Sequence, residues 1–323
     1  MMRRLILALA VIQASHPAAT ASDHPGGAAS IDGIWSFATL TPFERPAELA
    51  SKPYFTDEEA ATFVKDTLAR NDRDRRDGGA ATDAARGVAD FWFDRGTGLA
   101  VMNGRKLTSL VVDPPDGRVP ALTAAARAKV AARNADNRER PADGPENRSL
   151  QERCLSFNAG PPINLGPYNN YVRLFEMPKA VVIFTEMIHD ARIVWMDGRP
   201  HLPPHVKLWL GDSRGRWDGN TLVVDTTNYN DKGWITTAAA GGRIKGIRQS
   251  ESLHVVERFT RIDRNTIDYQ ATIDDPKTFL RPWTVAIPLH RNPNYRLYEY
   301  ACHEGNRAVE GVLRGARAEE KNK

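Results

Sequence analysis

The stretch Ser252–Ile273, SLHVVERFTRIDRNTIDYQATI, contains two alternating runs of apolar and polar residues on either side of Asp263-Arg264-Asn265. β-Branched and aromatic residues are frequent in both runs, and alternate side chains of a strand fall on opposite faces. Asp and Asn suit the tight connection between two such runs. The stretch therefore predicts a β-hairpin with strands at 252–262 and 265–273.

The same pattern recurs from about residue 149 to residue 302. Short turns such as Asp197-Gly198 and Asp218-Gly219-Asn220 separate the alternating runs, and no helical pattern of crossover length intervenes. The sequence thus predicts a mainly β fold, an antiparallel meander curled into a lipocalin-like barrel, because closure removes exposed edges. The predicted strands are 170–176, 179–187, 191–196, 206–210, 220–227, 252–262, 265–273, 283–290 and 296–302.

The N-terminal half mixes strands with helices. A first strand is expected at 32–39, where Trp35 and Phe37 alternate with polar residues. Thr56 and Glu59 form a capping-box pattern that predicts a helix over 57–70, and an Ala- and Arg-rich run predicts another over 123–134. Further strands are expected at 87–96 and 107–117. We interpret 31–323 as a single β-barrel-like domain with a helical insertion at about 56–148.

The first residues have the pattern of a secretory signal. Arg3 and Arg4 precede the apolar run 5–12, and Ala19-Thr20-Ala21 matches a cleavage site, so a signal peptide 1–21 is expected, cleaved after Ala21. Residues 22–30 read as a disordered leader. The predicted location is periplasmic or secreted. The apolar run is far shorter than the roughly 20 residues of a membrane span, so no transmembrane segment is expected.

The charge balance argues against nucleic-acid binding. The chain of 323 residues has a formal net charge of +4, which removal of Arg3 and Arg4 lowers to +2, and acidic and basic residues are interleaved. Cys154 and Cys302 are the two cysteines, and an oxidising compartment favours a disulfide between them over two buried thiols. No phosphate-binding glycine loop or nucleophile elbow occurs, so nucleotide binding and serine hydrolysis have no motif support. No cofactor is expected.

Six of the eight histidines lie after residue 188, several of them beside carboxylates. Alternation places Glu186 on the face of Val182 and Phe184, and apolar surroundings would raise its pKa toward the range of a general base. His189, Asp190 and Arg192 follow it in the turn. The alternative is that Glu186 and Arg192 form a structural ion pair.

Two later segments extend this candidate catalytic set. His254 and Arg258 share a strand whose two faces both mix polar and apolar residues, so His254 is either an inward functional group or a hydrogen-bonded core residue. His303 and Glu304 follow Cys302, and a cross-link beside them would help to hold a site. The alternative for this pair is a solvated strand end.

The segment His201–Trp217 carries candidate binding residues. Guanidinium and indole groups suit an anionic or sugar-like ligand, although such runs also form loops with mutually paired charges. Pro203-Pro204 between His201 and His205 excludes the helical spacing of a zinc motif, so no metal is assigned. The candidate substrate-binding residues are His201, Asp212, Arg214, Arg216 and Trp217.

Several motifs between about residues 31 and 320 resemble a large set of exported proteins of environmental bacteria. That resemblance implies export and one continuous unit, but no particular reaction. Gly33-x-Trp35 is also similar to the G-x-W motif in the first strand of lipocalins. The motifs that carry the first resemblance are LTPFERP (40–46), EMIHDAR (186–192), GDSRGRWDG (211–219) and YEYACHEGN (298–306).

These observations favour an exported enzyme that performs cofactor-free acid–base chemistry, as a lyase, isomerase or hydrolase, on a small oxygenated or aromatic molecule bound in the barrel. Glu186 would act as the base, His189 and His254 as proton carriers, and Arg192 or Arg258 as an anion stabiliser. The alternative is a non-catalytic lipocalin-like carrier of a small amphipathic ligand. A third interpretation is a metal-binding or envelope-associated structural protein.

Overall fold

The computed structural model describes residues 30–49, 51–87, 89–157, 160–235 and 246–322. The predicted signal peptide and all but the last residue of the predicted leader lie outside this part of the chain.

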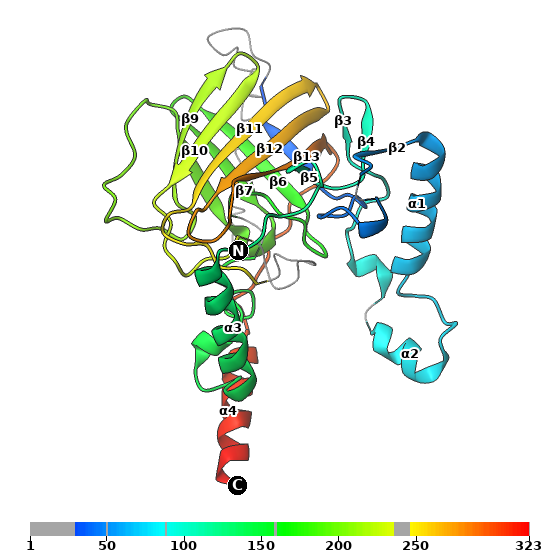
Figure 1. Cartoon of the computed structure of the whole chain (residues 1–323), viewed down its shortest axis with the longest axis vertical. Helices are drawn as coiled ribbons and strands as arrows, with labels where there is room; N and C mark the ends of the chain where they lie inside the picture. Colours follow the sequence, from blue (N-terminus) through cyan, green and yellow to red (C-terminus); the bar gives the residue numbers. More distant parts are fainter. Residues whose placement is uncertain (1–29, 50, 88, 158–159, 236–245, 323) are drawn as a thin grey trace, which may run out of the picture.

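Nine of the described strands close into a mixed β-barrel (Figure 1). The order around the barrel is β1-β6-β7-β8-β9-β10-β11-β12-β13, and β13 pairs with β1 to close it. This confirms the predicted mainly β, lipocalin-like barrel. The strands are β1 (Gly33–Ser36), β6 (Tyr171–Met177), β7 (Ala180–Thr185), β8 (Ala191–Trp195), β9 (Asp212–Asp218), β10 (Thr221–Thr227), β11 (His254–Asp263), β12 (Thr266–Asp274) and β13 (Trp283–Arg291).

One pair of neighbouring strands departs from the predicted antiparallel meander. β8 and β9 are parallel, with Val194 opposite Ser213, and residues 196–211 connect them without a helix. The predicted strand at 206–210 is wrong, because there Leu208 makes a single isolated bridge to Tyr229. The predicted strand at 296–302 is wrong as well, since this segment forms no ladder with the described strands.

Side chains of the inward-facing residues fill the barrel. On β11 these are Val255, Glu257 and Phe259, each with no exposed surface. The Phe259 ring lies 4.8 Å from that of Tyr269 on β12. Burying each large apolar side chain contributes roughly 1.5–3 kcal/mol, so these layers supply much of the stabilisation that holds the strands closed.

The segment between β1 and β6 carries the helices of the predicted insertion. Helix α1 (Asp57–Asn71) begins at a capping box in which Thr56 and Glu59 exchange hydrogen bonds, as predicted. It is followed by α2 (Gly79–Arg86). A small sheet of β2 (Tyr54–Phe55), β4 (Arg105–Leu107) and β3 (Val101–Met102) lies beside α1, and β5 (Val111–Asp113) adds to β13.

The predicted strand at 87–96 is wrong, because part of it forms a 3₁₀ turn, η2 (Asp90–Trp92). Of the predicted strand 107–117, only β5 and the last residue of β4 are extended in sheets. Two further 3₁₀ turns, η1 (Ala47–Leu49) and η3 (Pro145–Asn147), also lie between β1 and β6.

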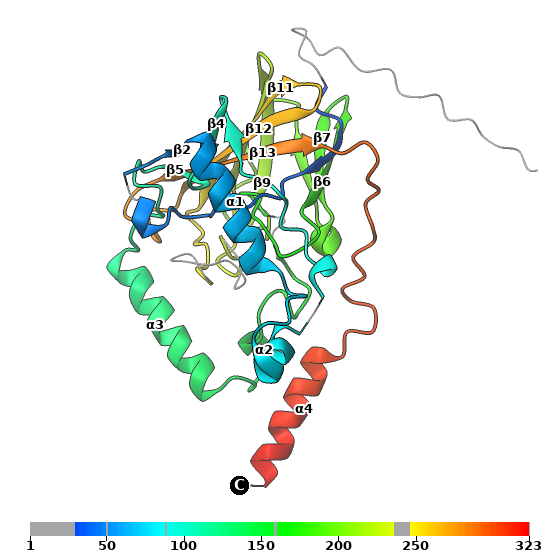
Figure 2. The ribbon, with the colours of Figure 1, turned by 90° about the vertical axis from the view of Figure 1, so that its right-hand side faces the viewer.

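Two further helices project from the barrel on the same side (Figures 1 and 2). Helix α3 (Ala124–Glu139) begins at Thr123, whose side chain accepts a hydrogen bond from the backbone of Ala126, and it runs five residues past its predicted end. Helix α4 (Ala308–Lys321) ends the described chain. In the described ranges, no helix has both the length and the apolar character to cross a membrane.

Candidate functional site

Glu186 lies where β7 ends, at the base of the turn into β8. It is fully buried, and it has left the strand alternation because β7 ends at Thr185 and Glu186 has helical backbone angles. Its carboxylate accepts hydrogen bonds from the hydroxyl of Tyr295, at 2.9 and 3.0 Å, and from the backbone N–H of Tyr298, at 2.8 Å. Glu186 therefore faces the segment that follows β13, and its observed partners do not include Arg192.

The turn after Glu186 has strained backbone. Ile188 and His189, in the 3₁₀ turn η4 (Met187–His189), have φ angles of +59° and +46°, a left-handed region that disfavours β-branched residues. Ile188 is nevertheless buried, in a cluster with Phe157 and Met187. Such strain costs on the order of 1–3 kcal/mol and persists where surrounding contacts fix it, which is common at functional sites.

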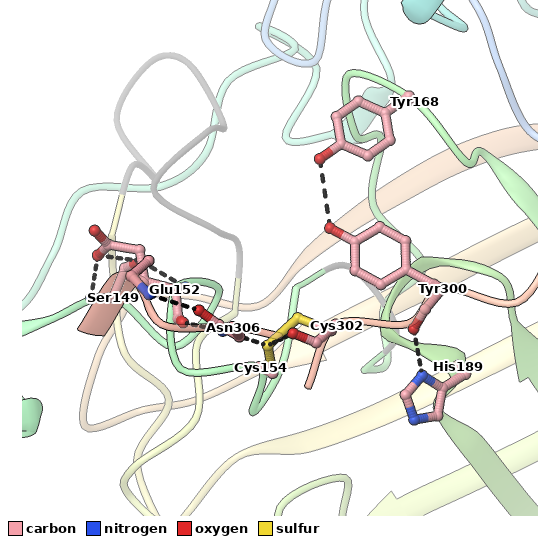
Figure 3. The surroundings of a disulfide bond; sticks show 9 residues. Ser149, Glu152, Cys154, Tyr168, His189, Tyr300, Cys302 and Asn306 are labelled. Atoms are coloured by element: carbon pink, nitrogen blue, oxygen red, sulfur yellow. Dashed lines mark hydrogen bonds between the residues drawn. A yellow bond between two sulfur atoms is a disulfide. The ribbon is translucent and has the colours of Figure 1, made fainter. Parts of the chain in front are cut away.

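The predicted disulfide is confirmed and holds the C-terminal segment beside this turn (Figure 3). Cys154 and Cys302 are bonded, with their Cα atoms 5.8 Å apart. The Nδ1 atom of His189 lies 2.8 Å from the carbonyl oxygen of Tyr300. A carbonyl only accepts, so Nδ1 carries the proton and Nε2 is the nitrogen that can accept one. The cross-link thus lies next to a histidine of defined tautomer.

Asp190 completes the turn. Burial raises the pKa of its carboxyl from 3.8 to about 6, and the neighbouring His189 opposes the shift. Its Oδ2 atom is buried and has no hydrogen-bond partner among the described residues. A carboxylate in this position loses hydration without gaining a compensating contact.

We expect Asp190→Asn to stabilise the protein at neutral pH. Because the folded pKa lies above the unfolded one, the folded state binds more protons between pH 4 and 6, and stability falls as the pH rises through this window. Removing the charge should therefore increase the free energy of unfolding by about 1–3 kcal/mol at pH 7.5, with little gain at pH 4.

Urea unfolding at both pH values measures this effect. Asp197→Asn is the control, since its exposed carboxyl has a pKa that Arg199 lowers, and no gain at pH 7.5 is expected there. A gain for Asp190→Asn that is equal at both pH values would contradict the burial explanation.

Next to Glu186 lies a pocket of about 940 Å³ with mostly aromatic walls, which we call the aromatic pocket. Its walls come from three segments that are far apart in the sequence. The rings of Tyr171 and Tyr295 stack at 3.6 Å, and Phe91 and Trp92 form a second ring pair at 4.6 Å. The pocket is lined by Phe91, Trp92, Phe93, Asp94, Tyr168, Asn169, Tyr171, Tyr295 and Tyr298.

Asp94 is the charged residue of the aromatic pocket. Burial raises the pKa of its carboxyl and the nearby Glu186 carboxylate raises it further, while backbone N–H groups of Asn170 and Gly96 act in the opposite direction. Its Oδ2 atom is buried and finds no hydrogen-bond partner in the described part of the chain. A carboxyl with a raised pKa in aromatic surroundings has the properties of a general acid or base.

Arg192 lies inside the barrel rather than beside Glu186. Its guanidinium donates two hydrogen bonds to Glu257, at 2.5 and 2.8 Å, and the pair is almost completely buried. The hydroxyl of Tyr269 donates to the same carboxylate at 2.9 Å, while accepting from the backbone N–H of Ile163. This buried network occupies the barrel interior.

His254 points outward from β11, so the interpretation of it as an inward-facing group is wrong. Its Nε2 lies 3.0 Å from Asp225 on β10, which raises the pKa of His254 and lowers that of Asp225. His201 contacts Asp225 and Asp212, each at 2.9 Å through a different ring nitrogen.

The other predicted site residues are spread over the barrel surface. Arg214 binds both oxygens of Asp212, at 3.0 and 3.1 Å, and Arg258 pairs with Asp218 at 3.2 Å. Trp217 packs against the core, whereas Arg216 and Glu304 are exposed.

His303 is exposed too, and its ring lies 6.3 Å from that of His189. The structure therefore groups Glu186, His189, Asp190 and His303 at one end of the barrel. Arg192, His254 and Arg258 lie elsewhere. Among the described residues, no group of three or more His, Cys, Asp or Glu side chains is arranged to hold a metal ion.

The sequence analysis did not identify Asp94 or the tyrosines around it. The run Phe91-Trp92-Phe93 reads as part of a strand, but Phe91 and Trp92 are 75% and 61% exposed and line the aromatic pocket. The dense aromatic residues of 91–93 and of 295–300 are the signal that was present in the sequence.

Comparisons of the chain with protein-family models, curated proteins and solved structures found no match.

Proposed function

We propose that this chain is an exported enzyme that performs cofactor-free acid–base chemistry on a small oxygenated or aromatic molecule held in the aromatic pocket. The observation that carries this proposal is the combination of ring-lined walls with Asp94, a carboxyl whose pKa is raised and one of whose oxygens has no partner among the described residues. The Cys154–Cys302 bond supports a periplasmic or secreted location.

The pocket fits a ligand with one planar, apolar part and at least one polar group. Tyrosine and tryptophan rings stack on planar ligands and on the apolar faces of sugars, while their polar atoms form hydrogen bonds. A volume of about 940 Å³ accommodates a small organic molecule.

Asp94 would then take a proton from the bound molecule or give one to it. Tyr295 is a positioning residue, since its hydroxyl is held by both oxygens of Glu186 while its ring stacks on Tyr171. His189, in the turn that follows Glu186, presents its Nε2 atom as a second acceptor.

If the aromatic side chains of the pocket hold the ligand, removing one of them should weaken binding. We expect Trp92→Ala to weaken binding of pocket ligands by about tenfold or more, because a stacking partner is removed. Ligand-observed NMR with a panel of phenols, benzoates, aryl glycosides and cyclic hydroxyketones measures the affinities. Trp195→Ala, on the outer face of β8, is the matched control and should bind like the wild type. Equal affinity of Trp92→Ala and wild type would place the ligand outside the pocket.

The lipocalin-like carrier remains the second proposal, and the exposed rings of Phe91, Trp92 and Tyr298 favour it. A carrier and an enzyme would share the same pocket and the same binding results. They differ in whether the bound molecule is changed and whether Asp94 is needed for that change.

A further inference from the structure

A second cavity, unrelated to the aromatic pocket, lies between helix α3 and the segment 247–250. Its volume is about 460 Å³. Lys129 and Arg133 reach it from α3, Arg248 and Lys277 line it from the barrel side, and Asp231 is the one carboxylate in its wall. Four cations therefore face a single carboxylate across this cavity.

The two arginines lack the partners that arginines in this protein usually have. Neither Arg133 nor Arg248 makes a side-chain hydrogen bond or an ion pair with any residue that the structure describes, and the Nε atom of Arg248 is buried. Burial, followed by repulsion from Arg248, lowers the pKa of Arg133 to about 10. The pKa of Arg248 is lowered too, by burial and then by repulsion from Arg153, while the Asp231 carboxylate opposes the shift.

A neighbouring cavity of about 730 Å³ shares both arginines as its wall. The three carboxylates of this larger cavity already have partners, since Asp136 pairs with Arg140, Glu152 with Arg148 and Glu146 with Arg153. The indole N–H of Trp234, also in this wall, is buried and has no acceptor in the described ranges. The wall between the two cavities thus carries the Trp234 indole N–H and the guanidinium groups of Arg133 and Arg248, and these donors have no acceptor among the described residues.

We propose that Arg133 and Arg248 bind a small multiply charged anion bearing a phosphate group. A phosphate dianion supplies the acceptors that both guanidinium groups lack, and it turns their mutual repulsion into shared attraction. Lys129 and Lys277 add charge at the rim of the cavity, and the first turn of α3, which also lines it, adds the partial positive charge of a helix start. The cavity has room for the phosphate and a small group attached to it.

The proposal is independent of the chemistry in the aromatic pocket. Because α3 lies in the insertion and residues 247–250 precede β11, a bound phosphate would tie the insertion to the barrel. We therefore expect the melting temperature of the wild-type protein to rise with phosphate concentration, as it does when a ligand binds only the folded state.

The test uses inorganic phosphate and glycerol 3-phosphate as probes, with sodium chloride at equal ionic strength as the reference. Binding is measured by calorimetry and by the shift in melting temperature. Arg133→Gln and Arg248→Gln should each weaken phosphate binding at least tenfold, and without phosphate Arg133→Gln should melt no lower than the wild type, because repulsion has been removed. Arg138→Gln, an exposed arginine on the same helix, is the matched control and should bind normally.

Tighter binding of glycerol 3-phosphate than of phosphate would assign the site to a phosphorylated small molecule, and the reverse order would assign it to free phosphate. Both orders support the proposal. It is overturned if chloride stabilises the protein as much as either probe, or if Arg133→Gln binds phosphate as tightly as Arg138→Gln does.

Discussion

Replacing Arg192 with methionine should lower the free energy of unfolding by about 3–5 kcal/mol, because it leaves the carboxylate of Glu257 buried and without its counter-charge. Arg192 and Glu257 are 3% and 0% exposed, and the pair lies in the closed barrel interior, where water cannot replace the lost partner. Urea unfolding followed by circular dichroism measures the change.

Two controls separate the cost of an unpaired charge from the loss of packing. The double variant Arg192→Met with Glu257→Leu should regain most of the lost stability, since burying two apolar side chains in place of an ion pair is often neutral. Arg258→Met breaks an exposed pair with Asp218 and should cost less than about 1 kcal/mol. If Arg192→Met lowers the free energy of unfolding by no more than Arg258→Met does, the buried pair of Arg192 and Glu257 does not stabilise the barrel.

Replacing both Cys154 and Cys302 with serine should lower stability by up to about 5 kcal/mol in the chain-entropy account, because the bond closes a loop with a sequence separation of 148. It should also weaken ligand binding in the aromatic pocket, since the bond ties down the segment that carries Tyr295 and Tyr298. Thermal unfolding and ligand-observed NMR measure the two effects.

A separate control is needed for the predicted loss of ligand binding in the aromatic pocket. Asp190→Asn lies in the adjacent turn but leaves the cross-link intact, so it should change stability without weakening binding. The account is contradicted if the double serine variant has the same melting temperature as the wild type. It is also contradicted if the variant melts at a lower temperature but binds ligand with unchanged affinity, because the cross-link would then not organise the pocket.

Most of the barrel could be predicted from the sequence because strand alternation and turn chemistry are local signals. The hairpin of β11 and β12 lies within a few residues of its predicted bounds. The parallel pairing of β8 with β9 could not be predicted, since nothing in the residues of their connection specifies which strand lies beside which. Pairing of that kind is decided by closure of the whole barrel.

The orientation of β11 shows a second limit. His254 and Arg258 lie on one face of the strand and Glu257 lies on the other, so both faces mix ionisable groups with apolar ones. Ion pairs with neighbouring strands decide which face of β11 points inward. Glu257 pairs with Arg192 of β8 inside the barrel, and His254 pairs with Asp225 of β10 on the outside. A single strand does not contain that information.

The candidate site combines predicted and unpredicted parts. The disulfide followed from there being two cysteines and an expected oxidising compartment, and it brings His303 to the turn that carries Glu186 and His189. Asp94 could not be predicted, because its neighbours in the pocket come from segments about 70 and 200 residues away. Only the fold brings these segments together.

We propose that Asp94 moves a proton to or from a molecule bound in the aromatic pocket. The direct measurement is NMR in D₂O of panel compounds that bind, with wild-type protein, Asp94→Asn and the control Asp116→Asn. We expect wild type and control to convert or deuterate at least one bound compound, and Asp94→Asn to lose 10²-fold or more of that rate while keeping its affinity, as for loss of a general acid or base.

The pH dependence adds a second readout to the same measurement. Because burial raises the pKa of Asp94, the acid limb of the wild-type rate should lie above the pH near 4 expected for an ordinary aspartate, and it should vanish in Asp94→Asn. A compound that binds in the pocket and is recovered unchanged and undeuterated from the wild type would contradict the enzyme and identify a carrier.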